Sequence, residues 1–255
     1  DHVDRDYLQA RDIGFATAPG SNATSAAEYV VSALLLAGRE ESGLAGRRVG
    51  IVGCGNVGSR VRDRLTALGM HCMINDPPLK AQGGHDDYVE LDAILDADVI
   101  TFHVPLTRDG DWPTLHLADR GFLERLKPGT TLINTARGGI VDETALAEAL
   151  LAGRLGGAGI DVLEREPPVA GSPLLAPDIP NLILTPHIAW ASRAARQRLV
   201  GEITENIEAF VSGRPRNRVV AVDRGDVDDV AASLLDHRVV DGDDPVKDAL
   251  QVDVD

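Results

Sequence analysis

The sequence predicts an α/β fold, a doubly wound parallel sheet of the Rossmann type, together with remnants of a second domain. Strand-like and helix-like segments alternate between residues 46 and 190, which is the pattern of a parallel sheet with helices on both faces. The strand-like segments are almost continuously apolar, as burial on both faces of a sheet requires. Ligands of such sheets bind outside the carboxyl ends of the strands, so functional residues are expected there.

The composition excludes several classes of function. Of the 255 residues, 44% are hydrophobic, which is enough for a sizeable core, and the net charge is -15. Nucleic-acid binding requires a basic face, and a membrane span requires ~20 apolar residues, so we expect neither partner. Cys54 and Cys72 are expected to be free thiols in a reducing compartment, which favours a cytoplasmic location. We assign no metal site.

The expected strands are short and regularly spaced, at residues 47–53, 71–76, 98–104, 130–136, 155–163 and 181–188. The expected helices alternate with them or flank them, at residues 21–42, 57–69, 91–97, 118–126, 142–153 and 191–213. The first helix has a possible capping box from Ser25 to Glu28 and is apolar on nearly all sides, so we expect it to be buried between two bodies. Asp142 and Gly153 are the expected N-cap and stop of the fifth helix.

A G-x-G-x-x-G pattern, Gly53 to Gly58, follows the first strand and opens a helix. Asp76 ends the next strand, and this context makes the pattern a dinucleotide fingerprint rather than a structural turn. Gly53 allows the tight turn, Gly55 lets the backbone approach a pyrophosphate, and Gly58 lets helix and strand pack closely. Asp76 should bind the ribose hydroxyls and repel a 2'-phosphate, which favours NAD over NADP.

Arg137, Glu166 and His187 each follow a strand of the predicted sheet, beside the dinucleotide site. Singly, each has an ordinary interpretation: a surface arginine, a solvated acid and a buried structural histidine. Together they predict a hydride-transfer centre, in which His187 moves a proton and Glu166 hydrogen-bonds its imidazole and stabilises the protonated form. Arg137 would fix a substrate carboxylate, and the two glycines after it are expected to leave room for the ligand.

Other candidate cofactor contacts lie at the same strand ends. Asp161 is placed to touch the nicotinamide ribose or amide, and His103 is read as a packing or cofactor-pocket residue rather than a catalytic one. The full set of candidates beside the three glycines and Asp76 is Asn56, Val57, His103, Val104, Pro105, Thr135, Ala136, Asp161 and Trp190.

Several ordered motifs, GIVGCGNVGSR, ADVITFHVPLT, LKPGTTLINTARGGIVDETAL, GIDVLEREPP and LTPHIAWAS, resemble the D-isomer-specific 2-hydroxyacid dehydrogenases. The resemblance covers about residues 1 to 215. It implies two Rossmann-like domains, NAD, a homodimer, a small 2-hydroxy acid as substrate, and an Arg–Glu–His catalytic set at Arg137, Glu166 and His187. Formate dehydrogenases of the same superfamily carry glutamine at the position of Glu166, which argues against formate.

The resemblance divides the chain into four segments. Residues 1–42 would be a remnant of the substrate domain with an interdomain helix, and 43–190 the NAD-binding domain. Residues 191–215 would be a helix returning to the substrate domain, and 216–255 an acidic flexible tail, with a small docking helix at 230–235 as the alternative. In the family most of the substrate domain precedes the position of residue 1, so we expect an N-terminally truncated chain.

Two branches of the family compete for the substrate. Stretches of the first half, among them APGSNATSAAEYVVSALL and DWPTLHLAD, resemble the 4-phosphoerythronate dehydrogenases of pyridoxal phosphate synthesis. The PHIAWAS stretch looks more like glycerate or hydroxypyruvate reductases, and Ala191 stands where the former branch has a substrate-contacting tyrosine. Outside catalysis, an NADH-sensing module like the corepressors of this superfamily, or an inactive fragment, are the alternatives. Turnover independent of any partner would argue against both.

Overall fold

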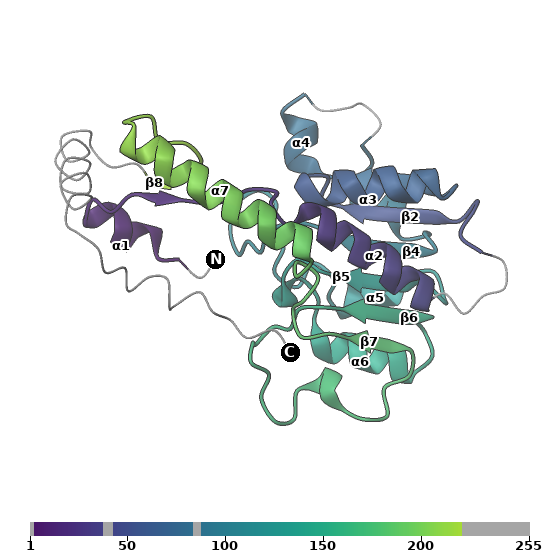
Figure 1. Cartoon of the computed structure of the whole chain (residues 1–255). Coiled ribbons are helices and arrows are strands. Elements are labelled where there is room, and N and C mark those ends of the chain that lie inside the picture. The colour runs from purple at the N-terminus through teal and green to yellow at the C-terminus, as the bar shows by residue number, and fades with distance from the viewer. Residues whose placement is uncertain (1–2, 38–42, 84–87, 221–255) are drawn as a thin grey trace, which may run out of the picture. The chain divides into compact units, whose positions relative to one another are not determined.

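A six-stranded, entirely parallel sheet forms the centre of the protein's larger unit (Figure 1). The structure, a computed structural model, describes residues 3–37, 43–83 and 88–220. The strands are β2 (Arg48–Val52), β3 (His71–Asn75), β4 (Val99–Phe102), β5 (Thr131–Asn134), β6 (Gly157–Ile160) and β7 (Leu182–Leu184). Each lies within a segment that the sequence predicted as a strand, so the predicted parallel sheet is confirmed.

The strand order is β3-β2-β4-β5-β6-β7. In chain order this is 2-1-3-4-5-6, which follows the flavodoxin-like variant of the doubly wound fold rather than the 3-2-1-4-5-6 order of the first-described Rossmann fold. The direction of winding reverses between β2 and β4. A crevice for a ligand is therefore expected at the carboxyl ends of these two strands.

Helices cover both faces of the sheet, each over its own apolar core. On one face α2 (Ala23–Ala37) and α3 (Asn56–Ala67) pack on side chains that include Ile51, Val99 and Ile133. On the other, α5 (Arg120–Arg125) and α6 (Glu143–Leu151) pack on Phe102, Leu132 and Ile160. Figure 1 shows these two helices beside the strands of the sheet. Because both faces are covered, the edge at the strand ends is where side chains remain accessible.

The first predicted helix differs from expectation in two ways. α2 begins at Ala23, so Ser25 lies inside the helix and is buried instead of capping it. The expected capping box is therefore wrong. Leu35 and Leu36 are 58% and 71% exposed, so the end of the helix is not buried on all sides. Residues 38–42, which were expected to continue the helix, lie outside the described residues.

Several short elements escaped the sequence analysis, because one or two turns carry too little periodicity to be recognised. They are α4 (Pro77–Ala81) and the 3₁₀ turns η2 (Gly138–Ile140) and η3 (Pro173–Leu175). The expected helix at 91–97 is a 3₁₀ turn, η1 (Leu91–Ile94). Within the described residues, no helix combines the length and apolar character that crossing a membrane requires.

The chain divides into two compact units, residues 19–200 and residues 1–18 with 201–255. The sequence placed the boundaries at 42/43 and 190/191 instead. The smaller unit contains α1 (Arg5–Ala10) and an antiparallel pair of β1 (Phe15–Ala16) and β8 (Arg218–Val220), while α7 (Arg193–Val211) runs from the larger unit into the smaller. β8 occupies the start of the segment expected to be a flexible tail, so that expectation is wrong for 218–220. The remainder of the predicted tail, 221–255, lies outside the described residues.

The two ends of α6 test the expected N-cap at Asp142 and the expected stop at Gly153. The Asp142 carboxylate accepts a hydrogen bond from the Ala145 N–H at 3.0 Å, and Gly153 follows the helix with a positive φ of 66°, both as expected. We expect Asp142→Ala to lower the free energy of unfolding by about 1 kcal/mol, because the first turn loses its acceptor. Urea unfolding measures this loss. Asp142→Ser should retain most of the stability, and an unchanged midpoint in Asp142→Ala would contradict the capping role.

Candidate active site

Two glycines of the loop have no space for a side chain, and the third has open space beside it. A Cβ on Gly53 would lie 2.7 Å from the His103 carbonyl oxygen, and one on Gly58 only 2.0 Å from the Gly53 carbonyl oxygen. Both glycines are therefore required by packing between β2, α3 and β4. A Cβ on Gly55 would meet no atom of the described residues within 4 Å. Gly55 thus leaves open space outside the loop, as the fingerprint predicts for a pyrophosphate site.

The N-terminus of α3 points into the same loop. Gly55 is its N-cap and has no side chain to bond the first N–H groups, and Asn56 and Gly55 are both exposed. The free N–H groups and the positive end of the helix macrodipole favour an anion at this position. Val57, the next candidate, is half-buried in the first turn and packs against the core beneath α2 and α3.

Asp76 ties the end of β3 to the glycine loop. One carboxylate oxygen accepts the Cys54 N–H at 2.7 Å, and the other accepts the Leu79 N–H at 3.0 Å as the N-cap of α4. The carboxylate is half-buried and lies directly beside the loop. Its expected contact with ribose hydroxyls stays a prediction, to which the structure adds a second role in holding the loop.

The ends of β4 and β5 carry four further candidates. Val104 is half-buried and Pro105 exposed after β4, while Thr135 and Ala136 follow β5. The Thr135 Oγ1 is buried and has no hydrogen-bond partner among the residues that the structure describes. An unpaired buried hydroxyl is costly, so Oγ1 marks a place where a ligand or water would supply the missing partner.

His103 is half-buried at the end of β4, and its Nε2 lies 3.0 Å from the Thr101 Oγ1. The surrounding protein desolvates the ring and lowers the pKa of His103 to about 3. The ring is therefore neutral near pH 7, which suits the expected packing or pocket role.

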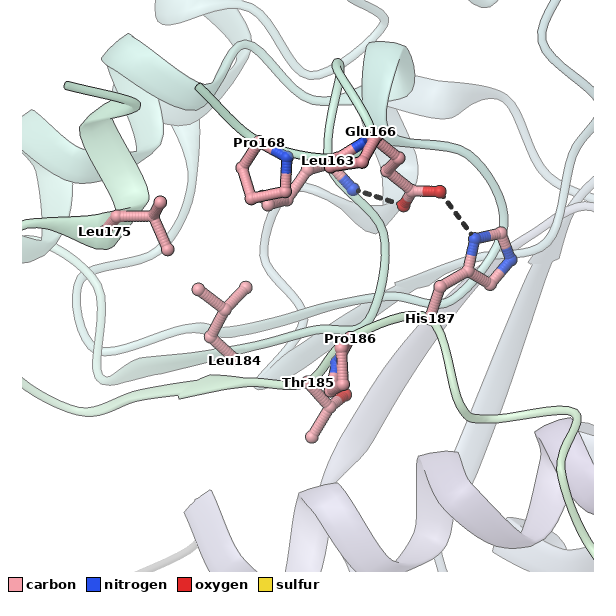
Figure 2. Close-up of a pocket in the computed structure, with 9 residues that line it drawn as sticks. Leu163, Glu166, Pro168, Leu175, Leu184, Thr185, Pro186 and His187 are labelled. Atoms are coloured by element: carbon pink, nitrogen blue, oxygen red, sulfur yellow. Dashed lines mark hydrogen bonds and ion pairs between the residues drawn. The ribbon is translucent and has the colours of Figure 1, made fainter. Parts of the chain in front are cut away.

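His187 and Glu166 face each other across the carboxyl ends of β6 and β7 (Figure 2). The His187 Nδ1 lies 2.7 Å from one Glu166 oxygen, and the other oxygen accepts the Leu163 N–H at 2.9 Å. An ionised carboxylate can only accept, so Nδ1 carries the proton and Nε2 is the nitrogen that can serve a substrate. The two side chains are 41% and 37% exposed, so the pair is open to solvent.

Asp161 positions the turn that carries His187. Asp161 is only 1% exposed. Its carboxylate accepts hydrogen bonds from the Ile188 and Ala189 N–H groups, each at 2.8 Å, and from the Thr185 hydroxyl at 2.6 Å. This turn holds His187 at a φ of 54°, a left-handed conformation that is rare outside glycine. Asp161 was expected to contact the nicotinamide ribose or amide; that contact stays a prediction, and the structure shows that its carboxylate already holds the turn that carries His187.

Gly138 and Gly139 do not leave room for a ligand, which corrects one expectation. A Cβ on Gly138 would lie 1.9 Å from the backbone carbon of Leu163, and one on Gly139 would touch Leu106 and Leu115. Because Gly138 has no side chain, the loop after β6 packs directly against its backbone, next to Arg137. This close approach brings the chain segments that carry Arg137 and Glu166 together. Arg137 itself is exposed, and its Nη1 donates to the Ala136 carbonyl oxygen at 2.7 Å.

Trp190 bonds the backbone of the turn that carries His187. Its indole Nε1 donates to the His187 carbonyl oxygen at 2.9 Å, and the Arg196 guanidinium lies 5.8 Å from the ring centroid. The indole thus fixes the backbone of His187. Its expected contact with the cofactor stays a prediction.

An apolar cavity of about 620 Å³ adjoins the His187–Glu166 pair. It lies between the loop after β6 and the end of β7, as Figure 2 shows. Besides the pair, its lining consists of Leu163, Pro167, Pro168, Leu175, Leu184, Thr185 and Pro186.

Sequence reasoning missed the residues that hold these groups from a distance. The Tyr29 hydroxyl of α2 lies 2.5 Å from the Thr185 Oγ1, which continues the chain of hydrogen bonds to Asp161. Glu143 accepts the Glu164 N–H at 2.6 Å and so reaches the loop that carries Glu166. Both residues stand in stretches that carry the family resemblance, but neither was assigned a role there, and Glu143 reads as an ordinary acid in the first turn of a helix. The sequence carried no signal for either contact.

A known protein family matches most of this chain. The description D-isomer specific 2-hydroxyacid dehydrogenase, NAD binding domain, applies to residues 25–189, which is more than half of the chain. The chain belongs to this family. The family expected from the ordered motifs is therefore confirmed, and the matched residues include the glycine loop, Arg137, Glu166 and His187.

Individual relatives show how much of each chain the similarity covers. Erythronate-4-phosphate dehydrogenase of Salmonella paratyphi B is 45% identical over 218 residues, which are 85% of this chain and 57% of that protein. The chain thus spans little more than half the length of the curated relatives that it matches. The structure of D-lactate dehydrogenase from Aquifex aeolicus, complexed with NAD and lactic acid, is 30% identical with a TM-score of 0.73, and the match covers 88% of this chain and 78% of that one.

The NADPH-dependent glyoxylate/hydroxypyruvate reductase from Sinorhizobium meliloti, in complex with NADP and malonate, has the same TM-score of 0.73 at 29% identity. This match covers 86% of this chain and 74% of that chain. Members similar to this chain thus use either nicotinamide cofactor, so cofactor choice must be argued from this chain's own residues.

The residues present fit NAD on three independent features. The loop leaves open space at Gly55, and the first N–H groups of α3 face the same space. At the end of β5, the Thr135 hydroxyl has no hydrogen-bond partner within the described part of the chain. All three lie at the carboxyl edge of β2, β4 and β5, where the winding of the sheet predicts the crevice.

The low pKa of His103 makes part of the folding stability depend on pH. The ring titrates near 6.5 in the unfolded chain and near 3 in the folded one, so in this window the unfolded state binds an additional proton. We expect the free energy of unfolding to fall as the pH drops from about 6.5 towards 3, by at most about 1.4 kcal/mol per pH unit from this residue. Urea unfolding across the window measures the slope.

The control separates this residue from other titrating groups. His103→Gln should flatten the slope, whereas His71→Gln, at an exposed position on β3, should leave it unchanged. Equal slopes for His103→Gln and the unsubstituted protein would contradict the assignment.

Proposed function

We propose that the protein is an NAD-dependent dehydrogenase that transfers a hydride between NAD(H) and the C2 position of a D-2-hydroxy acid or 2-oxo acid. The observation that carries this proposal is the His187–Glu166 pair, 2.7 Å apart, on the same sheet edge as the glycine loop. An acid–base group beside a nicotinamide site is the arrangement that oxidation of an alcohol requires, because a proton and a hydride leave together.

His187 would move the proton. Glu166 holds the Nδ1–H, so in the imidazolium form the Nε2–H can give its proton to the carbonyl oxygen of a 2-oxo acid as the carbonyl carbon is reduced, which leaves the neutral ring. In the reverse direction Nε2 accepts the hydroxyl proton of the 2-hydroxy acid. The negative charge of Glu166 stabilises the imidazolium in both directions. When bound, the nicotinamide supplies or accepts the hydride.

Arg137 would bind the substrate carboxylate. A guanidinium presents two parallel N–H donors that match the two carboxylate oxygens. Its place after β5 is supported by the packing of Gly138 on Leu163, which keeps the Arg137 segment against the loop of Glu166. The carboxylate and the reacting C2 are adjacent atoms in a 2-hydroxy acid, so the two groups must be held close together.

Asp76 would select NAD. Its carboxylate adjoins the loop at Cys54, so the 2'-phosphate of NADP would meet a like charge there. The Gly53, Gly55 and Gly58 loop with the α3 N-terminus would hold the pyrophosphate. Thr135, Ala136, Val104 and Pro105 would line the nicotinamide side of the crevice.

For the substrate we propose 4-phospho-D-erythronate, which would place the reaction in pyridoxal phosphate synthesis. The support is the 45% identity to erythronate-4-phosphate dehydrogenase over 85% of the chain. A glycerate or hydroxypyruvate reductase is the second candidate, favoured by Ala191 in place of the expected tyrosine and by likeness to the S. meliloti reductase. The homodimer and the cytoplasmic location expected from the sequence stay predictions.

Cofactor binding can be tested apart from turnover. We expect Gly55→Ala to leave stability unchanged, because its Cβ meets open space, yet to weaken NADH binding by about tenfold or more, because the Cβ would stand where the pyrophosphate lies. NADH fluorescence titration and urea unfolding measure the two effects. Gly201→Ala, where a Cβ also meets open space, is the matched control. Tight NADH binding by Gly55→Ala would contradict the position of the cofactor.

The catalytic set can be tested by steady-state kinetics of the full-length gene product with 4-phosphoerythronate, glycerate and hydroxypyruvate. We expect His187→Ala to lower kcat by about 10²- to 10⁴-fold, because the proton transfer is lost. Arg137→Lys should raise KM about tenfold or more, since a hydrogen bond to a charged group contributes about 1.5–3 kcal/mol.

His71→Ala, at an exposed position, serves as the control and should retain full rate. Near-normal kcat in His187→Ala would overturn the mechanism. NADH binding without turnover of any 2-hydroxy acid would instead favour a cofactor-sensing module.

A further inference from the structure

We propose that Glu143 is a positioning residue for the His187–Glu166 pair, in that its buried carboxylate anchors the loop that carries Glu166 on both sides of that residue. The inference deepens the proposed function and rests on it for the effect on turnover. The anchoring itself can be measured without turnover.

Glu143 is the first residue of α6, and it is only 9% exposed. Its Oε1 accepts the Glu164 N–H at 2.6 Å, and its Oε2 accepts the Ser172 hydroxyl at 3.2 Å. A buried carboxylate must be hydrogen-bonded to offset the loss of water, and charge-assisted bonds of this kind are the stronger ones. The α6 macrodipole further stabilises a negative charge at this end of the helix.

The two residues that Glu143 contacts lie on either side of Glu166 in the sequence. Glu164 lies two residues before it and Ser172 six residues after it, so one side chain fixes the loop at both ends. Leu163, one residue before the first anchor, donates its N–H to one Glu166 oxygen at 2.9 Å, and the other oxygen meets His187. The His116 Nε2, 2.9 Å from the Glu164 carboxylate, adds a weaker, exposed contact at the first anchor.

The pair depends on such an anchor because it is not held by burial. Exposed charge pairs contribute about 0–1 kcal/mol and do not by themselves fix a long side chain. With 37% of the Glu166 side chain exposed, its position follows from the loop beneath it. Displacement of catalytic groups by ~1 Å can cost ~100-fold in rate, so an anchor several residues away can govern turnover.

The ring nitrogens of His187 report the pairing directly. In the neutral form of the ring, bonding to Glu166 places the proton on Nδ1, and release of Glu166 frees the ring to adopt the Nε2–H form. ¹⁵N NMR of the imidazole nitrogens distinguishes the two tautomers, and the His187→Gln spectrum assigns the signal. We expect Glu143→Ala to shift His187 towards Nε2–H, in the same direction as Glu166→Ala, which removes the acceptor at Nδ1 altogether.

Glu143→Gln is the rescuing variant. Its amide oxygen can still accept the Glu164 N–H, and its amide N–H₂ can donate to the Ser172 oxygen, so the tautomer should stay close to that of the unsubstituted protein. In the full-length gene product, Glu143→Ala should lower kcat about tenfold or more with little change in the KM for NADH, and Glu143→Gln should restore most of it.

Glu148→Ala is the matched control, because Glu148 lies on the same helix, is half exposed and pairs with Arg120 away from the loop. It should change neither readout. A folded Glu143→Ala protein with the Nδ1–H tautomer and normal kcat would overturn the proposal. If Glu143→Ala does not fold, Ser172→Ala removes one anchor alone, and an unaltered tautomer there would overturn it equally. Absence of turnover in every variant, with the tautomer shift intact, would refute only the proposed function.

Discussion

The carboxylate of Asp161, closed off from solvent at the end of β6, determines where the candidate catalytic base can stand. A buried charge is tolerated only when its oxygens are hydrogen-bonded, and here the donors are the N–H groups of Ile188 and Ala189 and the hydroxyl of Thr185. These donors flank His187 and hold it in a left-handed conformation. The requirement of one buried acid thus fixes the geometry of an exposed base.

Glycines set the distances between the loops at this edge. Gly53, Gly58 and Gly138 each stand where another backbone or side chain leaves no space for a Cβ, so they let β4, α3 and the loop after β6 approach closely. Gly55 alone of the four meets open space among the described residues. The same residue type therefore serves packing in three places and leaves open space in one, and only the surroundings distinguish them.

The exposed His187–Glu166 pair rests on buried acids. Asp161 holds the turn of His187, and Glu143 holds the loop of Glu166, each by bonds to backbone N–H groups. This division leaves the pair accessible to solvent while its supports lie in the interior. Rigid support under an accessible pair is what proton transfer at a defined distance requires.

The sequence by itself determined the alternation of strands and helices, the glycine fingerprint and the Asp142 cap, because each depends on neighbours within a few residues. It also indicated that Arg137, Glu166 and His187 share an edge, since parallel strands end together. Only the tertiary structure decided that Gly138 packs on Leu163, that Asp161 and Glu143 act as anchors, and that residues 218–220 pair with β1. Those contacts join segments far apart in the chain, and no local pattern specifies which donor a buried carboxylate will meet.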